Sequence, residues 1–222
     1  MDKREFKITG DGSHTLYVEA LDETYHSSHG AIQEAIHVFI NAGLNHFNKD
    51  RINVLEIGFG TGLNAFLTLL EVDKSVIHVK YTGVEAFPLG LDITNQLNYV
   101  DELNSTNKEN EQFKQLHEVE WEGFQKITKN FNLRKTKVKL DIFEATEQFD
   151  VIYFDAFGPR VQPEMWTEPV FEKMYNCLAN DGVLVTYCAK GSVKRCLKTV
   201  GFKVESLPGP PGKREMTRAI KI

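Results

Sequence analysis

The fold of this chain is decided by the stretch Val54-Leu55-Glu56-Ile57-Gly58-Phe59-Gly60-Thr61-Gly62-Leu63-Asn64. Its apolar start predicts a buried strand, its alternating glycines predict a tight turn, and the apolar residues 65–70 predict a helix. Glycine lets the backbone reverse and lets a ligand lie directly on it, while the free amides at the start of the helix face that ligand. The stretch therefore predicts a βα turn that binds a nucleotide-like cofactor.

The spacing of the glycines separates two classes of cofactor. It is G-x-G-x-G, and a dinucleotide-binding G-x-G-x-x-G would need a glycine in place of Leu63. A nicotinamide cofactor is therefore disfavoured. The sequence contains no G-x-x-x-x-G-K-[ST], so a loop that cradles a nucleoside triphosphate is not predicted either.

A carboxylate follows the second predicted strand. Glu85 comes 23 residues after Gly62, about the separation that a βαβ unit requires. There it is placed to accept hydrogen bonds from both hydroxyls of a ribose. Carboxylates around a glycine turn fit a cofactor with ribose, ammonium and sulfonium groups, so we predict S-adenosylmethionine. The predicted contacts are Glu56, Gly58, Gly60, Gly62, Asn64 and Glu85. The alternative is an ordinary βα turn that uses glycine for geometry alone.

The composition is that of a globular protein. At 222 residues, with 41% hydrophobic and 26% charged residues, the chain is long enough for one α/β domain with a full core. No apolar run approaches the roughly 18 residues of a membrane span, and the charged amino terminus lacks the core of a secretory signal. Three cysteines without a C-x-x-C pair indicate reduced thiols. We therefore expect a cytoplasmic protein that does not associate with membranes.

Charge is distributed unevenly along the chain. Residues 186–222 carry nine lysines and arginines against two glutamates, although the net charge of the whole chain is −5. Polarised charge steers a polyanion toward one face of an acidic protein. Lys190, Lys213 and Arg214 are our candidates for nucleic-acid contacts. On charge alone, a solvated helix face beside an edge strand is the simpler explanation.

Segments typical of strands and helices alternate along the chain. This alternation predicts an α/β fold with a doubly wound, mostly parallel seven-stranded sheet of the Rossmann-like kind, preceded by an N-terminal β-hairpin. The hairpin is expected over 6–20 and a helix over 31–40. The strands are expected over 54–57, 78–86, 135–142, 149–155, 182–188, 202–207 and 216–222, with further helices over 63–70 and 194–199 and two within 87–123.

Four residues near the N-terminus raise the question of a metal site: His26, His29, Glu34 and His37. A single E-x-x-H, with no second copy and no thiolate pair nearby, is weak evidence for metal ligation. We therefore predict no metal. These residues are expected around the mouth of a substrate site or as surface histidines.

The most informative loop is 155–166, which follows the apolar run 149–154. Such a run predicts a central parallel strand, and ligands of open α/β sheets bind outside the carboxyl ends of the strands. Methyl transfer from a sulfonium needs alignment and a group that takes the proton of an amine acceptor. Asp155 is our candidate for that catalytic group. Phe157, Pro159 and Trp166 are candidate substrate contacts, with base stacking by Phe157 or Trp166. The alternative for Trp166 is packing in the core.

A further carboxylate, Asp141, is expected at the end of the third strand. From there it would accept a hydrogen bond from the exocyclic amine of the cofactor's adenine. A helix N-cap is an equally good interpretation.

Four motifs together resemble the methyltransferase domain of the bifunctional enzymes of tRNA 5-methylaminomethyl-2-thiouridine biosynthesis. The family has a G-F-G-T-G-L-N turn, a V-E-x-F-P-L strand end, a D-x-F-x-P-x-x-x-P-x-M-W loop and a K-R-E-M sequence. Here these stand at 58–64, 84–89, 155–166 and 213–216. The run 208–212, Pro-Gly-Pro-Pro-Gly, is less basic than the family pattern.

The resemblance implies a single methyltransferase domain over 1–222, with the hairpin and first helix in 1–45 and the Rossmann-like core in 46–222. It implies transfer of a methyl group from S-adenosylmethionine to 5-aminomethyl-2-thiouridine at the wobble position, in the anticodon region of tRNA. Glu56, Gly58, Gly60, Glu85 and Asp141 would contact the cofactor, and Asp155 the acceptor amine. The chain resembles a stand-alone form without the flavin-dependent oxidase domain, so upstream tRNA-modifying enzymes would supply its substrate.

Other functions remain open from the sequence. An aminopropyltransferase of the spermidine synthase type shares the sheet and a related cofactor, but its D-x-x-D-P loop has an aspartate where this chain has Gly158. Methyl transfer to a small-molecule amine is a second alternative. A non-catalytic cofactor-binding module is a third.

Overall fold

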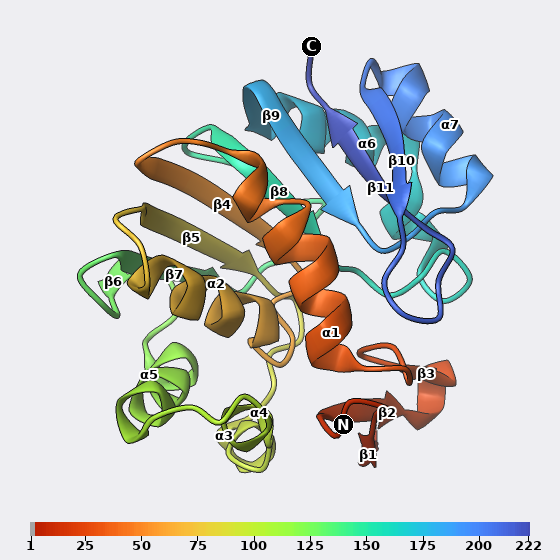
Figure 1. Ribbon diagram of the computed structural model, residues 1–222. Helices are drawn as coiled ribbons and strands as arrows, with labels where there is room; N and C mark the ends of the chain where they lie inside the picture. The colour runs from red at the N-terminus through yellow and green to blue at the C-terminus, as the bar shows by residue number, and fades with distance from the viewer. Residues whose placement is uncertain (1–2) are drawn as a thin grey trace.

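The computed structural model describes residues 3–222. The predicted domain boundary at residue 1 therefore lies outside the described residues. An eight-stranded sheet forms the centre of the molecule, with strand order β10-β11-β9-β8-β4-β5-β7-β6 (Figure 1). Its strands are β4 (Arg51–Ile57), β5 (His78–Val84), β6 (Gln125–Lys126), β7 (Phe131–Thr136), β8 (Phe149–Phe154), β9 (Leu178–Thr186), β10 (Lys203–Pro208) and β11 (Glu215–Ile220).

The pairing of the strands confirms the predicted α/β class. Strands β7, β5, β4, β8 and β9 run parallel to one another. Strands β11, β10 and β6 pair antiparallel at the two edges. The sheet has eight strands rather than seven, because β6 contributes only two residues at the edge and is too short to produce an alternating pattern.

Helices cover both faces of the sheet, because the side chains of a strand alternate between them. Val54 of β4 belongs to the core that packs under α1 (Ala31–Ala35), α2 (Leu63–Asp73) and α5 (Asn107–Glu118). Leu55 and Ile57 belong to the opposite core, with α6 (Glu168–Cys177) and α7 (Gly191–Val200). A six-residue π-helix, Ile36–Asn41, continues α1. The fold is therefore doubly wound.

The third strand ends earlier than predicted. β7 runs over Phe131–Thr136, not over 135–142. The alternation of Val138 and Leu140 is out of phase with the buried residues of β7, which are 131, 133 and 135. The last backbone bonds to the β5 side run from the amide of Glu85 to the carbonyl of Thr136 and from the amide of Val138 to the carbonyl of Glu85, and the chain leaves the sheet after them. Val138 and Leu140 then line a cavity instead of pairing in the sheet. Asp141 consequently lies in the β7–β8 loop and not at a strand end.

A separate antiparallel sheet forms at the N-terminus. The predicted hairpin is present as β1 (Arg4–Ile8) and β2 (His14–Val18), and β3 (Glu23–Thr24) adds a third strand. In Figure 1 this sheet lies beyond the N-terminal end of α1. The polar segment after β5 contains three helices rather than two: the short α3 (Leu91–Thr94) and α4 (Tyr99–Glu102), and the longer α5. Within residues 3–222, no helix is both long and apolar enough to cross a membrane.

Candidate functional site

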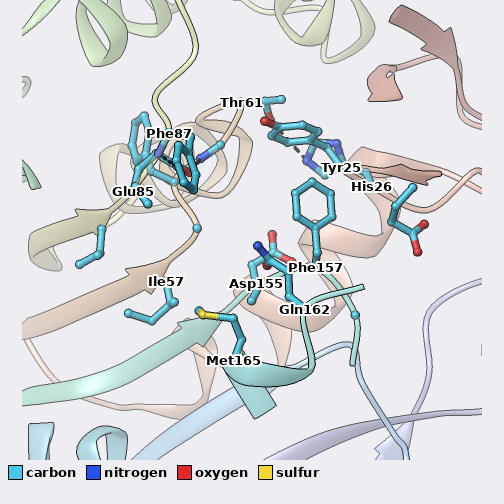
Figure 2. Close-up of a pocket in the computed structure, with 18 of the residues that line it drawn as sticks. Tyr25, His26, Ile57, Thr61, Glu85, Phe87, Asp155, Phe157, Gln162 and Met165 are labelled. Carbon is cyan, nitrogen blue, oxygen red and sulfur yellow. Dashed lines mark hydrogen bonds between the residues drawn. The ribbon is translucent and has the colours of Figure 1, made fainter. Parts of the chain in front are cut away.

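A cavity of about 1150 Å³ opens at the carboxyl ends of β4, β5 and β8. The glycine turn forms its floor, Glu85 and Asp155 stand on its two sides, and the segment around Tyr25 closes it from the N-terminal sheet. Figure 2 shows Glu85 and Phe87 across the cavity from Asp155 and Phe157, with Gln162 and Met165 below. Side chains from distant parts of the sequence therefore converge at the sheet edge where ligands of α/β proteins bind.

The glycine turn has a backbone that only glycine adopts readily. Gly58, Gly60 and Gly62 have φ values of 91°, 49° and 72°. A Cβ atom on Gly58 would lie 2.7 Å from the carbonyl oxygen of Asp155. Gly58 and Gly60 line the cavity, while Gly62 caps α2 outside the lining and faces the buried ring of His117.

The carboxylate of Glu85 is held in place by two backbone amides. Oε2 accepts from the amide of Gly60 over 3.0 Å, and Oε1 accepts from the amide of Phe87 over 2.8 Å. Each carboxylate oxygen keeps a further lone pair for a ligand. Glu85 is thus an oriented acceptor beside the glycine turn.

One asparagine joins two carboxylates beneath the cavity. Asn64 Nδ2 donates to Glu56 Oε1 and to Asp155 Oδ2, each over 2.9 Å. Glu56 is 1% exposed and lies behind Asn64, outside the lining of the cavity, and burial raises its pKa well above the ordinary value. Asn64 lines the cavity, and its buried Oδ1 has no hydrogen-bond partner. Of these two predicted cofactor contacts, only Asn64 can touch a ligand directly.

Asp155 lies immediately after β8. Burial raises its pKa to about 7, the negative charge of Glu34 adds to this rise, and Asn64 and Lys213 oppose it. A carboxyl group with this pKa is divided between its acid and carboxylate forms near neutral pH. It is therefore suited to taking a proton from a bound group.

Of the predicted substrate contacts in the loop after Asp155, only one lines the cavity. Phe157 lines the cavity and packs edge-on against Tyr25, with ring centroids 5.2 Å apart. Trp166 is 6% exposed, its indole nitrogen donates to the carbonyl of Phe157 over 2.8 Å, and its ring packs against Phe154. It therefore supports the loop from the core and does not line the cavity. Pro159 also lies outside the lining.

Of the three predicted nucleic-acid contacts, one lines the cavity and two lie outside it. Lys190 and Arg214 are exposed and lie outside the cavity. Lys213 lines the cavity, where it forms an ion pair with Glu34. Asp141 is exposed in the β7–β8 loop at the rim of the cavity, and its Oδ1 accepts from the amide of Ile142 over 3.0 Å.

Tyr25 and Tyr187 are among the cavity residues that the sequence did not identify as site residues. Glu34, which was expected around the mouth of a substrate site, also lines the cavity. Residues 3–222 contain no group of side chains that could hold a metal ion. His26, which the sequence placed beside Glu34 in the possible metal site, lies between the hydroxyls of Thr15 and Thr61, 3.3 Å from each. Burial lowers the pKa of His26 to about 4, so it is neutral there. No periodicity or spacing brings these residues together, because each comes from a different element.

Comparison with known proteins gives consistent results. Residues 104–222 match a family described as "S-adenosyl-L-methionine-dependent methyltransferase". The chain is 30% identical over 221 residues to the tRNA 5-methylaminomethyl-2-thiouridine biosynthesis bifunctional protein MnmC of Leptospira interrogans (strain Fiocruz L1-130), covering 94% of this chain and 34% of that protein. It thus spans about a third of the length of the curated relatives it matches.

Solved structures show the same likeness. The crystal structure of MNMC2 from Aquifex aeolicus matches with a TM-score of 0.77 and 26% identity, over 99% of this chain and 70% of that one. The 1,6-didemethyltoxoflavin-N1-methyltransferase of Burkholderia thailandensis matches with a TM-score of 0.52 and 13% identity, over 86% of this chain and 77% of that one. The second match is evidence for the fold alone.

Proposed function

Because the chain belongs to this family of S-adenosyl-L-methionine-dependent methyltransferases, we propose that it methylates the amine of 5-aminomethyl-2-thiouridine at the wobble position of tRNA. The similarity to MnmC and MNMC2 proteins supports this choice of substrate. The observation that carries it is Asp155, a carboxyl group with a pKa of about 7 in the cavity beside the glycine turn. Amine methylation requires a proton acceptor at such a position.

S-adenosyl-L-methionine is the methyl donor of this family. The residues around the glycine turn fit it. Gly58 and Gly60 let a ligand approach the backbone, Glu85 offers two oriented oxygens to ribose hydroxyls, and the free Oδ1 of Asn64 is an acceptor for an ammonium group. We assign the cofactor contacts to these four residues, with Asp141 at the adenine end. Glu56 and Gly62 lie outside the cavity lining. Glu56 positions Asn64, and Gly62 positions the start of α2.

When bound, the donor supplies an electrophilic methyl group on a sulfonium. The chain's part is to align the acceptor and to remove its proton. Asp155 takes that proton, because an ammonium group has no lone pair for the attack. Because Asp155 is buried, its surroundings favour the neutral acid and the neutral amine that this proton transfer produces over a carboxylate and an ammonium ion. Phe157 and Tyr25 provide aromatic surfaces at the mouth for the uracil ring.

We propose that the tRNA anticodon region docks across the mouth of the cavity. Lys190 and Arg214 are exposed and supply positive charge for the phosphates. Methyl transfer consumes a primary amine, so an upstream tRNA-modifying reaction must expose it. The site of action would be the cytoplasm, where tRNA is modified.

The test is direct. The purified protein is incubated with S-adenosylmethionine and tRNA that bears the aminomethyl group, and the digested nucleosides are examined by mass spectrometry. The expected result is a mass gain of one methylene unit, confined to the wobble uridine. Methylation of a free amine offered in place of tRNA, aminopropyl transfer when decarboxylated S-adenosylmethionine is offered as donor, or no turnover despite confirmed cofactor binding would replace the tRNA proposal by one of the other functions considered above.

A further inference from the structure

Lys213 comes from the connection between β10 and β11, which packs against the N-terminal part of the chain. His37 Nε2 lies 2.8 Å from the carbonyl oxygen of Pro208. A Cβ atom on Gly212 would overlap the ring of His29, so the backbone of the connection lies directly on that ring. In Figure 1 the connection extends toward the N-terminal end of α1. These contacts direct Lys213 into the cavity rather than outward.

Inside the cavity, Lys213 has two partners. It forms an ion pair with Glu34 of α1, and its Nζ lies 4.3 Å from the centroid of the Tyr187 ring. The side chains of Lys213 and Glu34 are 30% and 11% exposed. The hydroxyl of Tyr187 donates to the carbonyl of Ala156 over 2.9 Å, one residue after Asp155. The pair is therefore connected to the backbone that carries Asp155.

The charge balance of the site depends on this pair. Glu34 brings negative charge toward Asp155 from α1, whereas the buried Glu56 on β4 has a pKa raised well above its ordinary value, which favours its neutral form. Lys213 is the cation that offsets Glu34 there. The remaining titratable groups that act on Asp155 or are acted on by it are the buried hydroxyls of Tyr81, Tyr99 and Tyr187. Without Lys213, an incoming ammonium group would meet an unpaired second carboxylate beside Asp155.

We propose that the Lys213–Glu34 ion pair is a positioning element of the methyl-transfer site, which closes the cavity on the side of α1 and sets the charge that the acceptor amine meets beside Asp155. The proposal rests on the proposed function, since it concerns the same acceptor. The proposal gives Lys213 and its exposed neighbour Arg214 different roles. Lys213 acts on Asp155, and Arg214 contacts the nucleic acid.

The experiment follows the titration of Asp155 in Lys213→Met, in Glu34→Gln and in the double variant. The protein carries carboxyl-labelled aspartate, and the Asp155 signal in the NMR spectrum is identified by its loss in Asp155→Asn. Removing Lys213 should raise the midpoint by about one pH unit, and removing the charge of Glu34 should lower it by about one. In the double variant the two shifts should largely cancel. The pH midpoint of methyl transfer should follow the same order.

The matched control is Lys194→Met, which removes a second Lys–Glu pair of the same region, with Glu215 at 2.6 Å. Lys194 lies outside the lining of the cavity, so the midpoint should not change. An unchanged midpoint in Lys213→Met or in Glu34→Gln overturns the proposal. So does a loss of tRNA affinity in Lys213→Met equal to that in Lys190→Met, since Lys213 would then be a phosphate contact.

The titration requires no tRNA. If the wild-type protein methylates no tRNA while the midpoints shift as expected, the choice of acceptor fails and the action of the pair on Asp155 stands. If tRNA is methylated and the midpoints do not move, only the pair's action fails.

Discussion

The side-chain nitrogen of Asn64 donates to Asp155 Oδ2 over 2.9 Å. Asn64 lies in the first turn of α2, and Asp155 follows β8, so this hydrogen bond connects the glycine turn to the proposed base. It engages Oδ2 of Asp155, whereas Oδ1 accepts no hydrogen bond within residues 3–222 and is the more open of the two oxygens for an acceptor amine.

Asp155→Asn keeps the shape of the side chain and removes its basicity. We expect methyl transfer to fall by about 10²–10⁴-fold, the usual contribution of a positioned general base. S-adenosylhomocysteine should still bind, as measured by calorimetry. The wild-type rate should rise with pH and level off above about 7, since only the carboxylate form of Asp155 accepts a proton. Asp181→Asn is the control, because this exposed residue has a φ of 62°, which asparagine tolerates. Full activity in Asp155→Asn would exclude Asp155 from the mechanism.

The same substitution should change how stability depends on pH. The pKa of Asp155 is about 7 in the folded protein and 3.8 in its unperturbed form. The folded state therefore binds the proton more tightly, and this contribution to the free energy of unfolding is lost as pH rises toward 7. Asp155→Asn has no such loss. Between pH 5 and pH 8 we expect its stability relative to wild type to rise, on the order of 2 kcal/mol, in urea unfolding curves. Parallel curves for the two proteins would contradict the raised pKa.

Gly58→Ala tests the close approach in the glycine turn. Both Gly58 and Gly123 have a positive φ, 91° and 77°. A Cβ on Gly58 meets the backbone oxygen of Asp155 at 2.7 Å, whereas nothing lies within 4 Å of one on Gly123. Gly123→Ala should cost about 1 kcal/mol of stability from backbone strain alone. Gly58→Ala should cost more and should also weaken cofactor binding. Equal effects of the two substitutions would show that the approach to Asp155 is unimportant.

Glu85→Ala should weaken the binding of S-adenosylhomocysteine. Loss of hydrogen bonds to a charged group costs about 1.5–3 kcal/mol, which corresponds to roughly 10–100-fold in Kd. Titration calorimetry measures this change directly. The control is Glu118→Ala, an exposed residue at the end of α5. An unchanged Kd in Glu85→Ala would remove this residue from the cofactor contacts.

The family resemblance found in the sequence is confirmed, and it depends on short local patterns. The spacing of Gly58, Gly60 and Gly62 and the apolar run before Asp155 are features that neighbouring residues create by themselves. Together with the rule that parallel strands present ligands at their carboxyl ends, they were sufficient to predict the sheet and the cavity between Glu85 and Asp155. Asp141 was misplaced because apolar residues alternate again at 138, 140 and 142, after the chain has left the sheet.

The sequence by itself determined the α/β class, the glycine turn and the two carboxylates at the strand ends, because each follows from the periodicity or spacing of adjacent residues. Only the tertiary structure decided which side chains share the cavity. It buried Trp166 beneath the loop, placed Glu56 behind Asn64 and turned Lys213 inward to Glu34. Glu34 and Lys213 are separated by most of the chain, so no local pattern encodes their contact. It arises from the packing of the β10–β11 connection against α1.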